Sequence, residues 1–153
     1  MEINKVAVLG AGTMGMGIAW AVAAAGKKVV LYDLTQEIVD KTLGRIGKGL
    51  ARAEEKGQAP AGAKDFVTGN ITGTAKLEDI KDVDFVIESV LERMDIKKDV
   101  YSKLSNILGD DIIVATNTSS LSITEIASAY KKPENVIGMH FFNPAMVMPL
   151  IEE

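Results

Sequence analysis

A glycine-rich segment near the start of the chain has the residue types and spacing of a phosphate-binding loop. Gly10, Gly12 and Gly15 form a G-x-G-x-x-G sequence that closes an apolar strand and opens a helix, and in that context the pattern predicts dinucleotide binding. Gly10 permits the tight turn, Gly12 lets the backbone approach a pyrophosphate, and Gly15 lets helix and strand pack closely. We expect the free amides at the helix start, around Thr13 and Met14, to face the phosphate charge.

An acidic residue, Asp33, ends the second apolar strand, 23 positions after Gly10. A carboxylate at this point accepts hydrogen bonds from the hydroxyls of an adenosine ribose. It would repel a 2′-phosphate, and no arginine follows closely to receive one. The two features together favour NAD over NADP, while the alternative interpretation is an ordinary glycine turn and a solvated aspartate.

The only histidine of the sequence, His140, follows a predicted strand at its carboxyl end, the edge at which open α/β sheets bind ligands. Neutral imidazole is an effective base for a hydroxyl proton at cytosolic pH. Such a base needs a partner on its other ring nitrogen, and Glu152 follows after the Asn143-Pro144 turn. We therefore expect a base and its orienting carboxylate, against the alternative of a structural histidine and a charged chain end.

A polar segment, residues 117–120, follows the fifth predicted strand at the same sheet edge. Its hydroxyls can bind a substrate oxygen or cap the next helix, and capping is the commoner use. Ser122 and Glu125 independently fit a capping box for that helix. Ser119 and Ser120 are then left for another role.

These residues must be positioned by an alternation of short apolar runs and longer helical stretches. Strands are predicted over residues 5–9, 28–32, 71–74, 83–87, 112–115 and 136–139, and helices over residues 13–25, 37–56, 95–108 and 123–130, with a turn at 57–62 and a short helix after it. Strands separated by helices form right-handed βαβ units and a parallel sheet. The pattern predicts an α/β fold of the Rossmann type, a doubly wound and mostly parallel sheet with helices on both faces.

Length and composition limit the class of protein. The 153 residues fit one domain, with 47% hydrophobic residues and a net charge of −4. This charge argues against a nucleic-acid binder. The lack of cysteine in the sequence excludes disulfides, cysteine-based zinc sites and thiol catalysis. We predict no metal site and a cytoplasmic protein.

Two segments invite other interpretations. Residues 6–26 carry no charged side chain, which imitates a membrane span or a signal peptide. Glycines interrupt this stretch and the dinucleotide loop explains them better, so we predict neither. Residues 150–153 resemble the start of another strand rather than a tail. We therefore expect the single domain 1–153 to be a fragment of a two-domain protein.

Four sequence blocks, in this order, resemble the N-terminal domain of the short-chain L-3-hydroxyacyl-CoA dehydrogenases. They are Gly-Ala-Gly-Thr-Met-Gly at 10–15, Val-Ile-Glu-Ser-Val-Leu-Glu at 86–92, Asn-Thr-Ser-Ser-Leu at 117–121 and Gly-Met-His-Phe-Phe-Asn-Pro at 138–144. The resemblance covers essentially all 153 residues. It implies reversible hydride transfer between NAD and an acyl-CoA, as between 3-hydroxybutyryl-CoA and acetoacetyl-CoA in fatty acid or butanoate metabolism.

The resemblance also implies roles for single residues. His140 matches the family's base for the 3-hydroxyl proton, Glu152 the carboxylate that orients it, and Ser119 the serine that binds the 3-oxygen of the substrate. The residues that match the cofactor site beyond the glycine loop are Ser89, Glu92, Lys97, Ser119 and Asn143. Lys56 matches a lysine at the coenzyme A tail, where a merely solvated lysine is the alternative.

The chain departs from this family in two respects. It has no counterpart of the second, mostly helical domain that completes the acyl-CoA cleft and forms the homodimer, and Gly49 replaces a polar residue on the helix that faces coenzyme A. We therefore expect NAD binding with little turnover, and self-association through apolar residues near Phe141, Phe142, Met146 and Met148. Two alternatives stay open: a related β-hydroxyacid dehydrogenase, and a nucleotide-binding module without catalysis.

Overall fold

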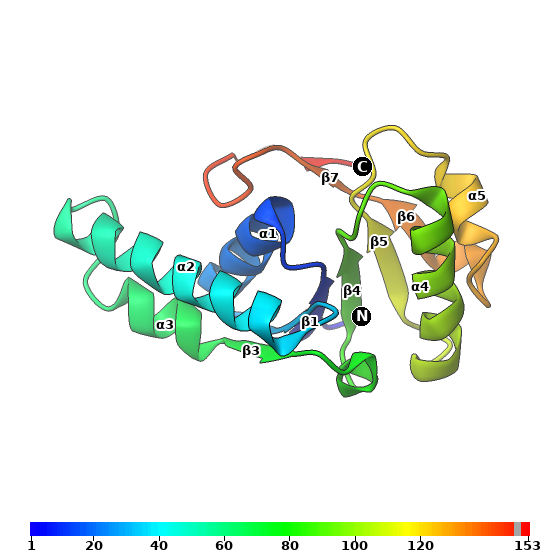
Figure 1. Cartoon of the computed structure of the whole chain (residues 1–153), viewed down its shortest axis with the longest axis horizontal. Helices are drawn as coiled ribbons and strands as arrows, with labels where there is room; N and C mark the ends of the chain where they lie inside the picture. The colour runs from blue at the N-terminus through cyan, green and yellow to red at the C-terminus, as the bar shows by residue number, and fades with distance from the viewer. Residues whose placement is uncertain (149–150) are drawn as a thin grey trace.

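The computed structural model describes residues 1–148 and 151–153. Strands and helices alternate along the chain, which finishes in two short strands (Figure 1). The strands are β1 (Lys5–Leu9), β2 (Lys28–Tyr32), β3 (Ile71–Thr74), β4 (Phe85–Glu88), β5 (Ile113–Thr116), β6 (Val136–Gly138), β7 (His140–Phe141) and β8 (Ile151–Glu152). The helices are α1 (Thr13–Ala24), α2 (Gln36–Glu55), α3 (Ala63–Gly69), α4 (Met94–Ile107) and α5 (Ile123–Ala127), with 3-10 turns η1 (Leu77–Ile80) and η2 (Pro133–Asn135).

Six strands form one sheet in the order β3-β2-β1-β4-β5-β6, and every neighbouring pair is parallel. The strand order reverses between β1 and β4, so the carboxyl ends of these two strands form the topological switch point, where open α/β sheets bind ligands. Among the described residues, β7 and β8 pair only with each other, in an antiparallel ladder. The predicted fold class, a Rossmann-type α/β fold with a parallel sheet, is confirmed.

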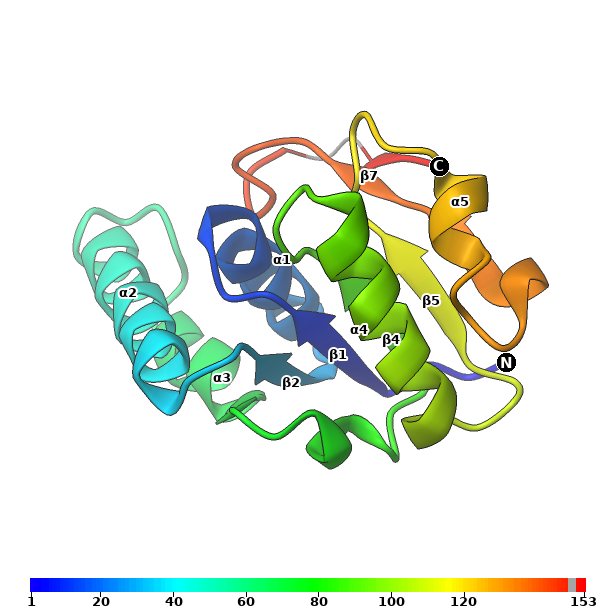
Figure 2. The same ribbon diagram turned by 45° about the vertical axis from the view of Figure 1, so that its right-hand side comes forward.

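The hydrophobic core is divided between the two faces of the sheet because successive side chains of a strand point to opposite faces. Val8 of β1 packs with Ile18 of α1 and Ile46 of α2 in one cluster. Leu9, the next residue, belongs to a second cluster with Leu104 of α4. Figures 1 and 2 show the corresponding helix layers, α1 to α3 on one side of the sheet and α4 with α5 on the other. The buried sheet therefore holds its carboxyl-end loops in fixed places.

Three predicted strands have different limits in the structure, and the strand expected over 112–115 is shifted by one residue to Ile113–Thr116. The strand expected from residue 83 begins at Phe85, because the Val83 amide donates to Ile80 O in the turn that closes η1. The strand expected over 136–139 ends at Gly138. His140 therefore lies just beyond the end of the sheet strand, at the start of β7.

The helix expected over 123–130 ends at Ala127. The amides of Ala129 and Tyr130 bond three residues back, to Ile126 and Ala127, which tightens the chain into turns before η2. The uncharged stretch 6–26 folds into β1 and α1. No helix in the described part of the chain is long and apolar enough to cross a membrane.

The glycines of α2 do not interrupt it, and the helix is continuous from Gln36 to Glu55. A Cβ added to Gly49 would lie 3.0 Å from two ring carbons of Trp20 on α1. That approach is closer than most side-chain contacts, so a glycine allows α1 and α2 to pack tightly here. The missing polar group at position 49 is therefore explained by packing within the domain.

Candidate functional site

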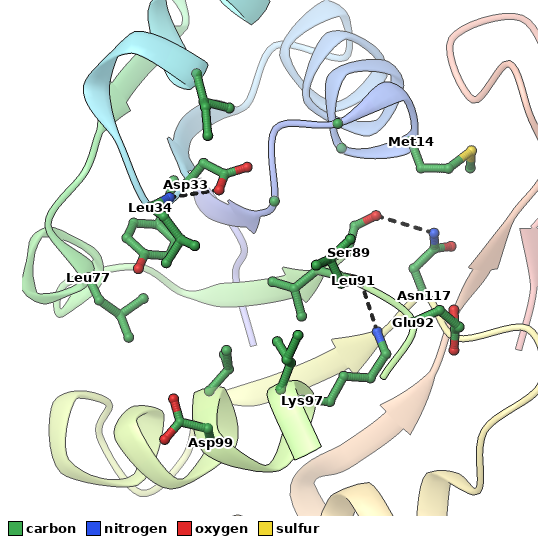
Figure 3. A pocket seen from close by; sticks show the side chains of 18 of the residues that line it. Met14, Asp33, Leu34, Leu77, Ser89, Leu91, Glu92, Lys97, Asp99 and Asn117 are labelled. Carbon is green, nitrogen blue, oxygen red and sulfur yellow. Dashed lines mark hydrogen bonds between the residues drawn. The ribbon is translucent and has the colours of Figure 1, made fainter. Parts of the chain in front are cut away.

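A cleft of about 880 Å³ opens beside the switch point, at the carboxyl edge of the sheet. Its walls come from the turn between β1 and α1, the end of β2, the loop after β4 and α4 (Figure 3). The predicted site residues that line it are Gly10, Gly12, Thr13, Met14, Gly15, Asp33, Ser89, Glu92 and Lys97. A cleft of this size is typical of small-molecule and cofactor sites.

The three glycines of the loop have different surroundings. Gly10 has a φ of 101°, and a Cβ there would lie 2.3 Å from Ser89 O. A Cβ on Gly15 would lie 1.8 Å from Gly10 O. A Cβ on Gly12 would meet nothing within 4 Å. The fold itself therefore requires Gly10 and Gly15, whereas the space over Gly12 is open to a ligand that must approach the backbone.

The N-terminus of α1 faces this open space. Gly12 is the N-cap of the helix, no side chain accepts a hydrogen bond from its first amides, and its first turn holds no acidic residue. Such an end attracts anions, because its amides lack partners and the helix dipole is positive there. The residues present therefore fit the pyrophosphate of a dinucleotide cofactor.

Asp33 is fixed beside the glycine turn by two backbone amides. Its Oδ2 accepts from Ala11 N at 2.8 Å, and its Oδ1 accepts from Leu34 N at 2.7 Å. Each oxygen keeps a lone pair for a ribose hydroxyl. Lys103, which also lines this end of the cleft, is paired with Asp99 at 2.9 Å. This geometry suits a ribose with free hydroxyls.

The floor of the cleft contains an ion pair that the sequence analysis did not predict. Lys97 Nζ lies 2.6 Å from Glu88 Oε2, and the two side chains are 1% and 0% exposed. Lys97 Nζ also donates to Val90 O at 3.2 Å, and Glu88 Oε2 accepts from Val90 N at 2.9 Å. Two of the three ammonium N–H bonds are thus used within the domain. Lys97 also borders the cleft, with only 1% of its side chain exposed.

The second oxygen of Glu88 is also hydrogen-bonded. Glu88 Oε1 accepts from Thr116 Oγ1 at 2.7 Å and from Tyr101 OH at 3.4 Å. Burial, and then the negative charge of Glu88, raise the pKa of Tyr101 well above its ordinary value of 10.0, so this hydroxyl remains a donor at neutral pH. The surrounding donors offset the cost of burying the carboxylate charge.

Polar side chains connect the loop after β4 with the loop after β5. The Thr118 hydroxyl donates to Glu92 Oε1 and accepts from Leu121 N. Asn117 Nδ2 donates to Ser89 Oγ at 3.4 Å. Glu92 and Ser89, both predicted at the cofactor site, are therefore held from the neighbouring strand.

The structure brings the predicted base and its predicted carboxylate together. His140 of β7 stands directly opposite Glu152 of β8, and its Nδ1 lies 3.7 Å from Glu152 Oε2, with 31% and 71% of the two side chains exposed. This distance is within ion-pair range but too long for a hydrogen bond. The backbone beside His140 is tied to the edge of the cleft, because Asn117 lines the cleft and accepts from Phe141 N at 2.9 Å.

His140 and Glu152 do not line the cleft, and three further predicted site residues also lie outside its lining. Ser119 is exposed in the loop between β5 and α5, and Asn143 is exposed in the loop after β7. Lys56 is the C-cap of α2 and is also exposed. Their roles stay predictions.

The capping box predicted for α5 is half formed. Ser122 is the N-cap, and its Oγ accepts from Glu125 N at 3.2 Å. The Glu125 carboxylate is used differently, because it pairs with Lys98 of α4 at 2.9 Å. Ser122 therefore caps the helix as predicted, while Glu125 ties α5 to α4.

The apolar surface expected near residues 141–148 is formed by different residues in the structure. Phe141 is 5% exposed and packs in the core, so its expected place on the surface is wrong; it faces inward on β7 while His140 faces outward. Val147, Met148 and Ile151 are 70%, 40% and 38% exposed. Of the chain end predicted as a strand, Ile151–Glu152 forms β8 and Leu150 lies outside the described residues.

Comparison with known proteins identifies the family. The family described as 3-hydroxyacyl-CoA dehydrogenase, NAD binding domain, matches residues 5–152. A 3-hydroxybutyryl-CoA dehydrogenase of Clostridioides difficile is 47% identical over 148 residues, which are 97% of this chain and 53% of that protein. A probable 3-hydroxybutyryl-CoA dehydrogenase of Bacillus subtilis is 43% identical over 152 residues, 99% of this chain and 53% of that protein. The chain thus spans about half the length of these relatives.

Solved structures agree with this assignment. FadB2 of M. tuberculosis has a TM-score of 0.95 and 38% identity, over 99% of this chain and 53% of that one. The (S)-3-hydroxybutyryl-CoA dehydrogenase PaaH1 of Ralstonia eutropha has a TM-score of 0.94 and 38% identity, over 98% of this chain and 53% of that one. The family match also identifies NAD as the cofactor. The chain belongs to the 3-hydroxyacyl-CoA dehydrogenase family, and it is the NAD-binding domain of that family.

Proposed function

We propose that this domain supplies the cofactor site and the proton-accepting base of an L-3-hydroxyacyl-CoA dehydrogenase. The observation that carries the proposal is the His140–Glu152 pair, whose strand is hydrogen-bonded to Asn117 at the edge of a cleft that fits a dinucleotide. The substrate would be an acyl-CoA, interconverted between the 3-hydroxy and 3-oxo forms. Support for this class comes from the C. difficile relative, a 3-hydroxybutyryl-CoA dehydrogenase by name.

NAD supplies the hydride acceptor when it is bound in the cleft. His140 takes the proton of the substrate 3-hydroxyl on Nε2, because its Nδ1 side faces Glu152 at 3.7 Å. The C3–H pair of electrons leaves as hydride, and the O–H pair becomes the second bond of the new carbonyl. Glu152 stabilises the positive charge that the imidazole gains. Ser119 donates its hydroxyl to the 3-oxygen.

The remaining residues bind the cofactor and the coenzyme A part of the substrate. The amides at Thr13 and Met14 bind the pyrophosphate, and Asp33 binds the adenosine ribose. The side chains proposed to hold the nicotinamide half are Ser89, Glu92, Lys97, Ser119 and Asn143. Lys56 would meet the coenzyme A tail as a point charge. We further propose cytoplasmic action and a homodimer, to which the exposed Val147, Met148 and Ile151 are suited as contact residues.

The test is acetoacetyl-CoA-dependent oxidation of NADH by the protein at its full encoded length. We expect His140→Ala to lower turnover by about 10²- to 10⁴-fold without changing the Kd for NADH. Normal turnover in this variant would reject the proposal. Turnover of free 3-hydroxyacids without turnover of acyl-CoA would assign the protein instead to a related β-hydroxyacid dehydrogenase.

A further inference from the structure

One cleft residue, Asn117, connects the cofactor site with the strand that carries His140. Its Oδ1 accepts from Phe141 N at 2.9 Å, and its Nδ2 donates to Ser89 Oγ at 3.4 Å, the contact drawn in Figure 3. Its own amide donates to Glu88 O at 2.9 Å. The side-chain amide group of Asn117 therefore contacts the loop after β4 through its nitrogen and β7 through its oxygen.

His140 depends on such a contact because it lies beyond the six-stranded sheet. Met139 N donates to Thr116 O at 2.9 Å, and in the described residues this is the last main-chain bond from the chain to the sheet. After it, β7 pairs only with β8, a strand of two exposed residues. The peptide that follows His140 is held to the end of β5 by the Asn117 side chain.

We propose that Asn117 is a positioning residue for His140. By holding the Phe141 amide, it sets where the imidazole stands relative to the cleft that Asn117 itself lines. A displacement of about 1 Å in a reacting group can cost about a hundredfold in rate. The effect on catalysis rests on the proposed function, whereas the effect on the backbone at Phe141 does not.

The competing role for Asn117 is that of a cofactor ligand. Its amide group has two N–H bonds and only one donates to Ser89, so the other can reach a bound ligand. The two roles predict different measurements. A positioning residue mainly lowers kcat, and a ligand mainly raises the Kd for NADH.

The experiment replaces Asn117 by Ala in the protein at its full encoded length. Its readouts are the NADH Kd, kcat with acetoacetyl-CoA, and hydrogen exchange at the Phe141 amide. We expect kcat to fall by about 10- to 100-fold, exchange at Phe141 to accelerate at least severalfold, and the NADH Kd to stay near the wild-type value. Asn117→Asp keeps an acceptor at the same place, so we expect it to restore the protection of the Phe141 amide.

Asn135→Ala is the matched control. Its Nδ2 donates to Asp110 O at 2.9 Å. This bond has a similar length, but it joins the segments before β5 and before β6, at the edge of the sheet opposite the cleft. We expect all three readouts to stay unchanged in this variant.

Two results would overturn the proposal: unchanged Phe141 exchange in Asn117→Ala, or a rise in NADH Kd that accounts for the whole loss of activity. If the wild-type protein does not reduce acetoacetyl-CoA, the proposed function fails, and the exchange measurement still decides the role of Asn117.

Discussion

Two pairs of a carboxylate and a basic side chain lie at the same edge of the sheet and differ in distance, burial and hydrogen bonding. Glu88 and Lys97 are 2.6 Å apart and at most 1% exposed, and Glu88 accepts further bonds from Thr116, Tyr101 and Val90. His140 and Glu152 are 3.7 Å apart and 31% and 71% exposed. The first pair is fully enclosed by its own domain, and the second stands at the surface with room to move.

The difference fits the roles proposed for the two pairs. A cation that anchors a cofactor must keep its charge and place, so a buried and fully hydrogen-bonded carboxylate is suited to hold it. A base must gain and lose a proton in each turnover, so its partner should favour the charged form without locking it. We infer that this domain builds a rigid floor for NAD and leaves the proton-transfer pair adjustable.

The largest effect is expected from breaking the buried pair. Glu88→Ala leaves the Lys97 ammonium buried without its carboxylate, and removing one partner of such a pair costs about 3–5 kcal/mol of unfolding free energy. Urea denaturation of the variant and the wild type measures the difference. Asp99→Ala is the matched control, because Asp99 lies on α4, the helix that carries Lys97. This variant breaks the exposed pair with Lys103 and should cost less than about 1 kcal/mol of unfolding free energy. Equal losses of unfolding free energy in the two variants would contradict a larger stabilisation by the buried pair.

The buried pair also shows where prediction from sequence stopped. The motif at 86–92 predicts Glu92 at the cofactor site, and Lys97 is predicted only as a cofactor contact. Glu88 is not predicted as its partner. A signal existed, because a glutamate ends an otherwise apolar strand and buried carboxylates need partners. Its partners lie on β5 and α4, however, and only the packing of those elements determines which side chains reach it.

Local patterns did predict the parts of the site that depend on backbone conformation. The glycine turn, the place of Asp33 and the start of α1 follow from residue types over a few positions, and the structure has them. The pairing of His140 with Glu152 was expected from chemistry, whereas its exposure and the inward-facing Phe141 depend on how β7 leaves the sheet. The sequence therefore predicts the conformation of the binding loop, but not the surroundings of His140.

A second prediction tests whether the floor and loop form one cofactor site. In Gly12→Ala the added Cβ meets no atom of the domain within 4 Å, so folding stability should be nearly unchanged. It would occupy the space over the α1 amides, whose hydrogen bonds to a charged group are worth about 1.5–3 kcal/mol each. We expect the NADH Kd to rise about 10- to 100-fold, measured by NADH fluorescence. Undiminished binding would place the pyrophosphate elsewhere.

A third prediction concerns the exposed pair. Glu152→Gln keeps the shape of the side chain and removes its charge. Exposed pairs add at most about 1 kcal/mol to stability, so the denaturation midpoint should barely move. Turnover should fall by about tenfold, equivalent to about 1.4 kcal/mol, because the imidazole gains its charge without a counterion. A variant with full turnover would show that Glu152 does not assist His140.

The smallest effect is expected at the other end of the strand that carries Glu88. Asp84, just before β4, accepts from the amides of Asn4 and Lys5 at 2.9 Å each, and these bonds hold its pKa below the ordinary value of 3.8. A carboxyl whose pKa is lower in the folded state stabilises the fold above its unfolded pKa. That contribution is lost as the pH falls through the folded pKa.

Asp84→Asn keeps an oxygen for the two amides and removes the titration. The acid limb of the stability curve, measured by denaturation between neutral pH and pH values below 3.8, should therefore become shallower than in the wild type. Backbone hydrogen bonds, and not the charge of Lys5, are the main cause of the lowered pKa, so added salt should change this difference little. An unchanged acid limb would mean that Asp84 holds its two amides equally well when it is protonated.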